Sequence, residues 1–331
     1  MTTSKSASSF NQKTMKKRTI IRIYPLVIMG LLLMFSSSCK KKKATDSTNE
    51  CVAVGNTVVS NTNGFDRPVG IAFSPGQKVV VTEFHGMNPD GTGYAYGSPG
   101  AVKIYNSTAN FYTNISDVSI PFAIINNGPE AVVFDANENL YIAETENTAG
   151  ISIFQSPYAI KLKTIWGGFN NPRGIALDGS GNLYVADDGN GKIVKITNPL
   201  GVDAESDLIT GLTTPKAVAI SGNYIFIAEY DANRVTKYNI ASPGASVETF
   251  NIDHPIDLHV SGCMLYISSH GAIYGGYGSS KVVAVKADNM NAGIQKEYTG
   301  FTGITFGIAT DQAGNLFISD FSDGKIRKYL K

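Results

Sequence analysis

The chain has 331 residues, of which 43% are hydrophobic and 17% charged, and its formal net charge is +1. The charge is unevenly spread: residues 1–43 hold ten Lys/Arg and no Asp/Glu, which leaves 18 basic and 27 acidic residues in 44–331. That remainder carries a net charge of −9 and has no basic stripe, so nucleic acid is excluded as an expected partner.

The N-terminal segment has the order of a secretory signal. A basic start at Lys16–Arg18 precedes an apolar run, Tyr24–Phe35, and small residues then lead to Cys39. This order is typical of a signal peptide, and Arg22 keeps the apolar run shorter than the roughly 20 residues of a membrane-spanning helix. We expect residues 1–39 to be the signal, with translation starting at Met1 or, where the sequence MKKRTII begins, at Met15.

A cysteine directly after such a run resembles the lipobox of bacterial lipoproteins, whose cysteine is acylated. The strict pattern has Leu three residues earlier, where this chain has Ser36. Residues 40–51 would form a polar tether, and its first four lysines suit anionic headgroups. The resemblance implies an exported protein, held through a lipid on Cys39 in the cell envelope, at the outer membrane. The alternative is an ordinary cleaved signal.

Two further cysteines lie beyond the signal, in a compartment that permits disulfides. Cys51 and Cys263 would link the start of the domain to a late repeat. Alternatively, Cys263 is a small buried residue in a strand and Cys51 is free in the tether.

One pattern is repeated six times along the rest of the chain. Its clearest copies are NPRGIALDGSGNLYVADDGNGKI at Asn171–Ile193 and TFGIATDQAGNLFISDFSDGKI at Thr305–Ile326. The other copies begin at Pro68, Pro129, Pro215 and Pro255. The residue that closes the second apolar run recurs with spacings of 61, 43, 42, 40 and 51, at Glu83, Glu144, Asp187, Glu229, Ser269 and Asp320. A period in the low forties is typical of propeller blades.

Each copy predicts three short strands, as at 174–177, 183–186 and 192–196, because Val, Ile, Tyr and Phe alternate with Gly/Asn/Asp turns. A fourth strand is expected in less regular stretches such as 206–209 or 246–250. Four-stranded units bury their faces when they stack radially. The last copy ends after its third strand, so Val52–Ser60 is expected to supply its outer strand.

The phrase Pro-x-Gly-Ile-Ala…Gly-Asn-Leu-Tyr-Val-Ala-Asp…Lys-Ile resembles the NHL repeat, and the resemblance covers Phe65 to Tyr329. It is weakest in the first copy, at Lys78, and in the fifth. It implies an all-β fold over 52–331: a six-bladed β-propeller with four-stranded antiparallel blades, a central channel and an N-terminal strand closing the last blade. It implies no reaction, since related propellers are binding modules, sensors, lyases and lactonases.

Polar residues stand where the chain enters the inner strands: Arg67, Glu130, Arg173, Lys216 and His254. They predict a mouth that binds a charged or sugar-like ligand, or they are solvated positions that tolerate any polar residue. Asp257 and His259 are more informative, because the two equivalent positions hold Gly or Ala in four other copies, those beginning at Pro68, Pro172, Pro215 and Thr305. At strand spacing they share one face, where they would touch a ligand, water or metal, or form a satisfied buried pair.

Two turns after the second strand are enlarged and alternate Gly with Tyr, HGMNPDGTGYAYGSPG from His85 and HGAIYGGYGSS from His270. Tyrosine offers a large amphipathic contact area, so these flaps are candidate contacts for peptide or carbohydrate through Tyr94, Tyr96, Tyr274 and Tyr277. The alternative is that these insertions have no function, because such a turn tolerates changes in sequence and length.

The recurrent acids are expected to be structural, bracing turns or pairing with Lys192, Arg234 or Lys325. The run DGSGN at Asp178 resembles a calcium loop superficially but lacks the closing Glu, so it is interpreted as turn geometry.

Neither enzyme pattern of related propellers is complete. An amidating-lyase-like site needs His from several inner strands, and a gluconolactonase-like site needs Glu, Asn and Asp around a divalent ion. No catalytic residue is assigned and no cofactor is expected. If a divalent metal binds, its candidate ligands are Asp257, His259 and Glu130. The sequence predicts a monomeric binding module for an unknown protein, peptide or carbohydrate, acting through its flapped face; the alternative is a metal-dependent hydrolase or lyase.

Overall fold

The computed structural model describes residues 52–55, 58–84, 100–113, 118–120, 128–145, 149–271 and 280–331. Chain contacts divide the sequence into Met1–Thr48 and Asn49–Lys331, and every described residue falls in the second unit. The expected signal, Cys39, Cys51 and the four flap tyrosines lie outside the described residues. Within the described part of the chain, no helix has the length and apolarity needed to cross a membrane.

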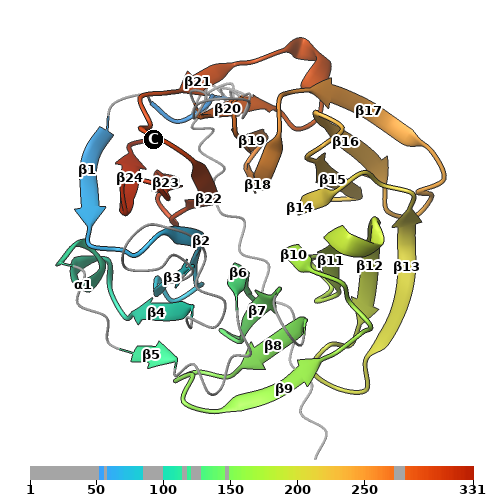
Figure 1. The fold of residues 1–331 in the computed structure, drawn as a ribbon, viewed down its shortest axis with the longest axis horizontal. Helices are drawn as coiled ribbons and strands as arrows, with labels where there is room; N and C mark the ends of the chain where they lie inside the picture. The colour runs from blue at the N-terminus through green and yellow to red at the C-terminus, as the bar shows by residue number, and fades with distance from the viewer. Residues whose placement is uncertain are drawn as a thin grey trace, which may run out of the picture. The chain divides into compact units, whose positions relative to one another are not determined.

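Six four-stranded antiparallel sheets surround a common axis (Figure 1). Five of the sheets run outward from the axis in chain order, and the sixth runs β22, β23, β24 and then β1. Blade one contains β2 Pro68–Phe73, β3 Val79–Glu83, β4 Ala101–Tyr105 and β5 Val118–Ile120, with helix α1 Thr108–Thr113 between its last two strands. Blade two contains β6 Pro129–Phe134, β7 Leu140–Glu144, β8 Gly150–Phe154 and β9 Lys161–Ile165. Blade three contains β10 Pro172–Leu177, β11 Leu183–Asp187, β12 Lys192–Thr197 and β13 Ala204–Thr210.

The second half of the ring follows the same plan. Blade four contains β14 Pro215–Ser221, β15 Tyr224–Glu229, β16 Arg234–Asn239 and β17 Ser246–Asn251. Blade five contains β18 Pro255–Ser261, β19 Met264–Ser269, β20 Lys281–Lys286 and β21 Lys296–Tyr298. Blade six contains β22 Thr305–Thr310, β23 Leu316–Asp320, β24 Lys325–Tyr329 and β1 Val58–Asn63. Short 3₁₀ turns lie at Asp188–Asn190 and Met290–Ala292. The six-bladed fold expected from the repeat is confirmed.

The N-terminal strand closes the ring. β1 pairs antiparallel with β24, from Val58 opposite Tyr329 to Asn63 opposite Lys325. The expected closing segment was therefore right in position, although the strand begins later than Val52 and extends to Asn63. The preceding residues also hold the seam, because Val54 N donates to Tyr266 Oη (3.1 Å) and Val54 O accepts from Tyr298 Oη (2.6 Å).

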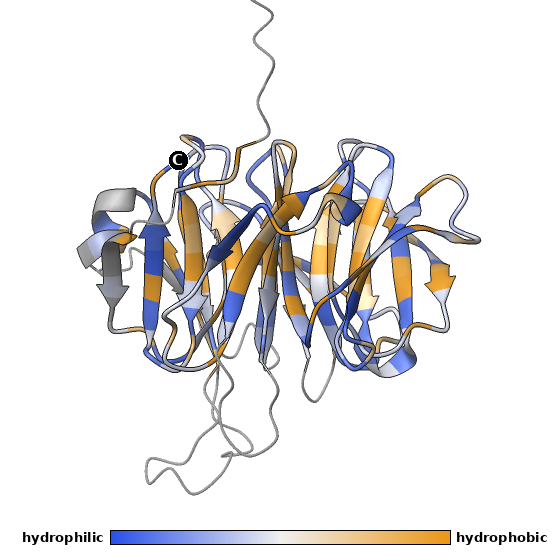
Figure 2. Ribbon diagram, turned by 90° about the horizontal axis from the view of Figure 1, so that it is seen from above, coloured by the Kyte–Doolittle hydropathy of each residue, from blue (hydrophilic) through white to orange (hydrophobic). Residues whose placement is uncertain are grey.

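The hydrophobic core lies between neighbouring blades. The second strand of each blade is the most buried: every residue of β3, β7, β11, β19 and β23 is buried. Outer strands such as β13 are mostly exposed. Figure 2 shows apolar residues banding the middle of the strands. Because each blade is covered on both faces by its neighbours, stability depends on a complete ring.

The recurrent acids are structural, as expected, but two of the expected partners were wrong. Glu229, fully buried, accepts from Arg234 Nε (2.8 Å) and Thr213 N (3.1 Å). Glu83 and Asp187 accept from the equivalent backbone N–H groups, those of Asp66 and Asn170. These bonds fasten the second strand to the loop before the first. Lys192 pairs with Asp207 and Lys325 with Asp323, whereas Asp320 pairs with Arg327.

The DGSGN run at Asp178 forms a turn, as expected from the sequence. Asp178 Oδ1 accepts from the N–H groups of Ser180 and Asn182 (both 2.9 Å), while Oδ2 accepts from Asn182 Nδ2 (2.8 Å) and Tyr184 Oη (3.0 Å). Burial alone would raise the pKa of Asp178, but these hydrogen bonds hold it below the usual value. Both oxygens are therefore occupied by the turn itself.

Cys263 is disulfide-bonded. The other cysteines in the sequence, Cys39 and Cys51, lie outside the described residues. The reading in which Cys263 is a free buried thiol is therefore wrong.

Candidate functional site

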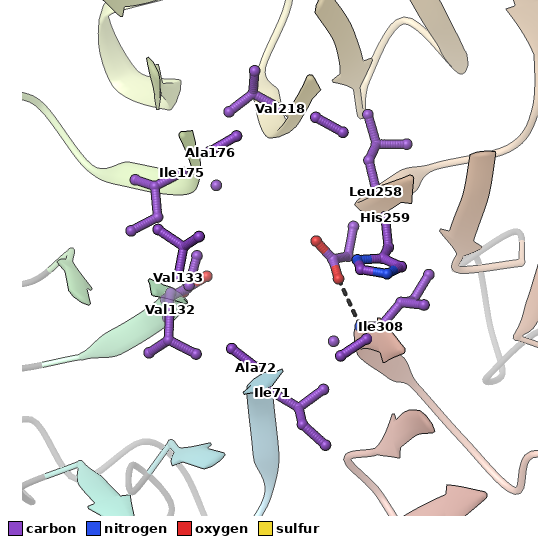
Figure 3. Close-up of a pocket in the computed structure, with 18 of the residues that line it drawn as sticks. Ile71, Ala72, Val132, Val133, Ile175, Ala176, Val218, Leu258, His259 and Ile308 are labelled. Carbon is purple, nitrogen blue, oxygen red and sulfur yellow. Dashed lines mark hydrogen bonds between the residues drawn. The ribbon is translucent and has the colours of Figure 1, made fainter. Parts of the chain in front are cut away.

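A cavity of about 360 Å³ lies on the axis of the propeller. All six inner strands line it (Figure 3). Most of the lining residues are aliphatic, with Ile71, Val132, Ile175, Val218, Leu258 and Ile308 forming one ring. Its polar lining residues are Glu130, Arg173, Lys216, Asp257, His259 and Thr310. Five of the predicted site residues are therefore brought to one cavity.

The inner strands approach one another closely where their third residue is Gly or Ala. A Cβ on Gly174 would lie 2.5 Å from Ala217 Cα, and one on Gly307 would lie 2.3 Å from Val69 O. A register irregularity follows the first residue of each inner strand and sets this local geometry. Asp257 is the one charged residue in this column, so its presence on the channel wall needs a reason.

Asp257 bridges blades five and six. Its Oδ2 accepts a hydrogen bond from Ile308 N at 2.8 Å, the dashed line in Figure 3. No Lys, Arg or His forms an ion pair with this carboxylate among the described residues. Burial raises the pKa of Asp257 to about 7, although the N–H groups of Ile308 and Leu258 lower it. The channel therefore holds one carboxyl group without a counter-charge.

His259 lies two residues further along β18 and faces the same cavity. Its Nε2 is 2.9 Å from Thr310 Oγ1, which itself donates to Ser261 Oγ at 3.1 Å. Because the Thr310 proton is used in that bond, Nε2–H is the donor, and Nδ1 is left as an acceptor. Burial lowers the pKa of His259 to about 4, so the ring is neutral at pH 7. Asp257 and His259 thus line the same cavity, each bonded to a residue of β22 and not to the other.

The mouth of the channel is the side on which the inner strands begin, and a compensated charge network lies there. Arg173 pairs with Glu130 through Nη1 and with Asp188 through Nε (3.1 Å). Lys216 Nζ also contacts Asp188, at 2.6 Å. Two cations thus meet two carboxylates across blades two, three and four, and each charge has a partner.

Aromatic rings continue this belt across blades four, five and six. Tyr230 packs on His254, with centroids 4.8 Å apart, and its hydroxyl lies 3.4 Å from His270 Nδ1. His270 Nε2 donates to Thr305 O at 3.2 Å. Burial lowers the pKa of His270 to about 4. His270 packs on Phe306, and Phe306 on Phe321. We call the set Glu130, Arg173, Asp188, Lys216, Tyr230, His254, His270, Phe306 and Phe321 the mouth belt.

In five blades, the residue before the first strand has a left-handed backbone conformation, with positive φ. Its φ is +51° at Arg67, +64° at Asn171, +50° at Thr214 and +40° at His254, while the fifth position is a glycine, Gly128. For residues with a Cβ this conformation costs about 1–3 kcal/mol. Arg67 and His254 are therefore held at strained positions beside the mouth, and the cavity lining does not include them.

Several members of the mouth belt were missed by sequence reasoning. Asp188, Tyr230 and Phe321 each follow the recurrent acid directly, as does His270 its serine counterpart. An alignment of the residue after each recurrent acid, and not of the acids alone, would have predicted that these residues lie together at the mouth. The three metal candidates are not gathered: among the described residues, no group of three or more His, Cys, Asp or Glu is placed to hold a metal ion.

Residues 169–196, spanning β10 to β12, match the sequence model described as NHL repeat. The chain is a six-bladed β-propeller that contains an NHL repeat. A search of curated protein sequences finds no match for it.

Solved structures resemble the propeller in fold. A chain of a nidogen/laminin complex has 17% identity and a TM-score of 0.58, covering 73% of this chain and 84% of that one. A streptogramin B lyase has 16% identity and a TM-score of 0.53, covering 82% and 97%. A chain of Kuenenia stuttgartiensis hydrazine synthase has 17% identity and a TM-score of 0.56, covering 84% and 80%. At these identities the likeness concerns the fold alone.

Proposed function

We propose that this propeller is a binding module that engages its partner through the mouth face and admits a ligand group into the channel. The observation that carries the proposal is the mouth belt, in which charged and aromatic side chains from five neighbouring blades form one connected surface above a cavity of about 360 Å³. Concave sites with an apolar wall and a few convergent polar groups are typical of ligand binding.

Backbone strain supports the same face. Arg67, Thr214 and His254 keep left-handed conformations that glycine would adopt at lower cost. Such residues cluster at functional sites, where the surrounding structure holds them in place. The fold also occurs in a chain of a nidogen/laminin complex, which assembles with another protein.

Site-specific photo-crosslinking tests the proposal. A benzoyl-phenylalanine is placed at exposed positions near the mouth, Asp231 or Asp253, and in matched variants at exposed turns at the other ends of the inner strands, Ser180 or Asn223. After irradiation of cells that make the protein, discrete adducts are expected from the mouth positions alone. Equal adducts from both faces, or none from the mouth, would overturn the proposal.

The anchoring part of the proposal rests on the sequence near Cys39. If the cysteine carries lipid, the Cys39→Ser protein moves from the membrane fraction to the soluble fraction, while Cys263→Ser stays with the membrane. Retention of Cys39→Ser in the membrane would refute the anchor and leave the mouth-face proposal untouched.

A further inference from the structure

Two side chains with hydrogen-bond acceptors, Asp257 and His259, line the channel. Asp257 uses one oxygen on Ile308 N, and His259 uses Nε2 on Thr310. Both residues line the cavity, and among the described residues no side-chain donor pairs with the second Asp257 oxygen or with His259 Nδ1. Two acceptors on one strand face, two residues apart, therefore point to a ligand that donates.

The cations of the site already have carboxylate partners. Arg173 and Lys216 are tied to Glu130 and Asp188 at the mouth, so the uncompensated charge of the channel is the carboxylate of Asp257. An anionic ligand would meet this charge unfavourably. A buried carboxylate is stabilised when a cation reaches hydrogen-bond distance.

The rest of the wall sets the shape of the ligand. Small and branched aliphatic residues of the other inner strands, such as Ala72, Val133 and Ala309, line the rest of the cavity. About 360 Å³ is near the lower limit of small-molecule sites. The site thus suits a short apolar body that ends in a charged donor group.

We infer that the channel binds a small primary amine as its ammonium ion, with the ammonium group between Asp257 and His259 and the alkyl part along the aliphatic ring. An ammonium offers three N–H donors, enough for the Asp257 carboxylate and His259 Nδ1 together. A bare metal ion would find only these two side chains, since no larger group is gathered in the described residues. The inference names the ligand chemistry of the proposed binding module and rests on that proposal.

Isothermal titration calorimetry at pH 8 tests the inference with n-butylammonium chloride as the probe. The matched probes are n-butanol, which has the same length without charge, butyrate, and calcium or zinc chloride, all at constant ionic strength. We expect butylammonium to bind at least tenfold more tightly than butanol or butyrate. Equal binding of butanol would overturn the inference, and so would saturable binding of the metal ions alone.

Variants locate the binding. Asp257→Asn is expected to weaken butylammonium binding about 10- to 100-fold, the loss typical of one charge-assisted hydrogen bond. Asp253→Asn, an exposed carboxylate two residues before β18, serves as the control and should bind as the parent does. Unchanged binding by Asp257→Asn would overturn the inference.

A measurement on the parent protein guards against a variant that does not fold. The imidazole ¹⁵N shift of His259 Nδ1 should move when butylammonium is added and stay in place with butanol. A static shift would overturn the inference. The crosslinking experiment contains no added amine, so mouth-face binding and amine binding can fail separately.

Discussion

Asp257 Oδ2 accepts a hydrogen bond from Ile308 N at 2.8 Å, and this bond links the inner strands of two neighbouring blades. Elsewhere the third residue of the inner strand is Gly or Ala, as where Gly174 approaches Ala217. Between blades five and six, a carboxyl group occupies the corresponding place and faces the channel. The ring thus replaces a close backbone contact with a titratable group at one seam.

Asp257→Asn is expected to stabilise the protein at alkaline pH. The folded pKa of about 7 lies above the unfolded value of 3.8, so the stability linked to this group is fully present below pH 3.8 and is lost as the pH rises through 7. Asparagine keeps an acceptor for Ile308 N without the charge. Urea unfolding should show a gain of about 2–4 kcal/mol at pH 8 and little change at pH 4. Destabilisation at both pH values would mean that the carboxylate is a structural anchor.

His259 and His270 are expected to change the stability with pH in the opposite direction to Asp257. Burial lowers the pKa of both His259 and His270 to about 4, so their stabilising contribution is present above pH 6.5 and is lost as the pH falls through 4. The parent should therefore lose stability between pH 6.5 and 4, partly offset by Asp257. His259→Gln and His270→Gln should each make the pH dependence in this window less steep. Thermal melts at half-unit pH steps would measure this, and parallel curves for parent and variants would contradict it.

The Glu229–Arg234 brace should matter more than a surface ion pair. Glu229 is fully buried. Without the Arg234 guanidinium, the partners that the described residues leave to its carboxylate are Thr236 Oγ1 and the Thr213 N–H. Arg234→Met is expected to cost about 1–3 kcal/mol, since the arginine itself is partly exposed. Lys281→Met, whose partner Glu297 is exposed, should cost less than about 0.5 kcal/mol. Equal losses in urea unfolding would show that the brace has no special role.

Ring closure can be tested by truncation. A chain that begins at Gly64 lacks β1 and the buried Val54, whereas a chain that begins at Cys51 keeps both. Loss of the Val54 contact alone is worth about 1.5–3 kcal/mol, so the shorter chain should be destabilised by about 3 kcal/mol or more. If both chains melt at the same temperature, β1 is dispensable.

The disulfide partner of Cys263 can be assigned by substitution. Cys51→Ser and Cys263→Ser should lower the melting temperature equally under oxidising conditions, and the double variant should add nothing further. The expected loss is about 2–5 kcal/mol. If Cys39→Ser reproduces the loss instead, Cys39 is the partner.

The blades were predictable from the sequence, because turn residues and apolar runs recur with one period. A strand that is ambiguous in one copy can therefore be assigned from the other copies. Asp257 and His259 also stood out in the sequence, because most other copies have Gly or Ala at these positions, and both line the cavity. The mouth belt was predicted only in part. Tyr230 and His270 meet across blades four and five, and that contact depends on how neighbouring blades stack, which one copy of the repeat does not encode. The acid partners failed for a similar reason: Arg327, two residues further along β24, reaches Asp320, whereas Lys325 pairs with Asp323.

The pairing of β1 with β24 also sets an order of events in synthesis. Asn63 leaves the ribosome early, yet its partner Lys325 follows only 262 residues later. At roughly 5–20 residues per second, the first strand waits about 10–50 s without its neighbour. Its sequence, VVSNTN, carries Ser, Asn and Thr where other strands carry Val and Ile. A strand of this composition can remain solvated until β24 has been made. The composition of β1 therefore suits a strand that pairs last and completes the ring.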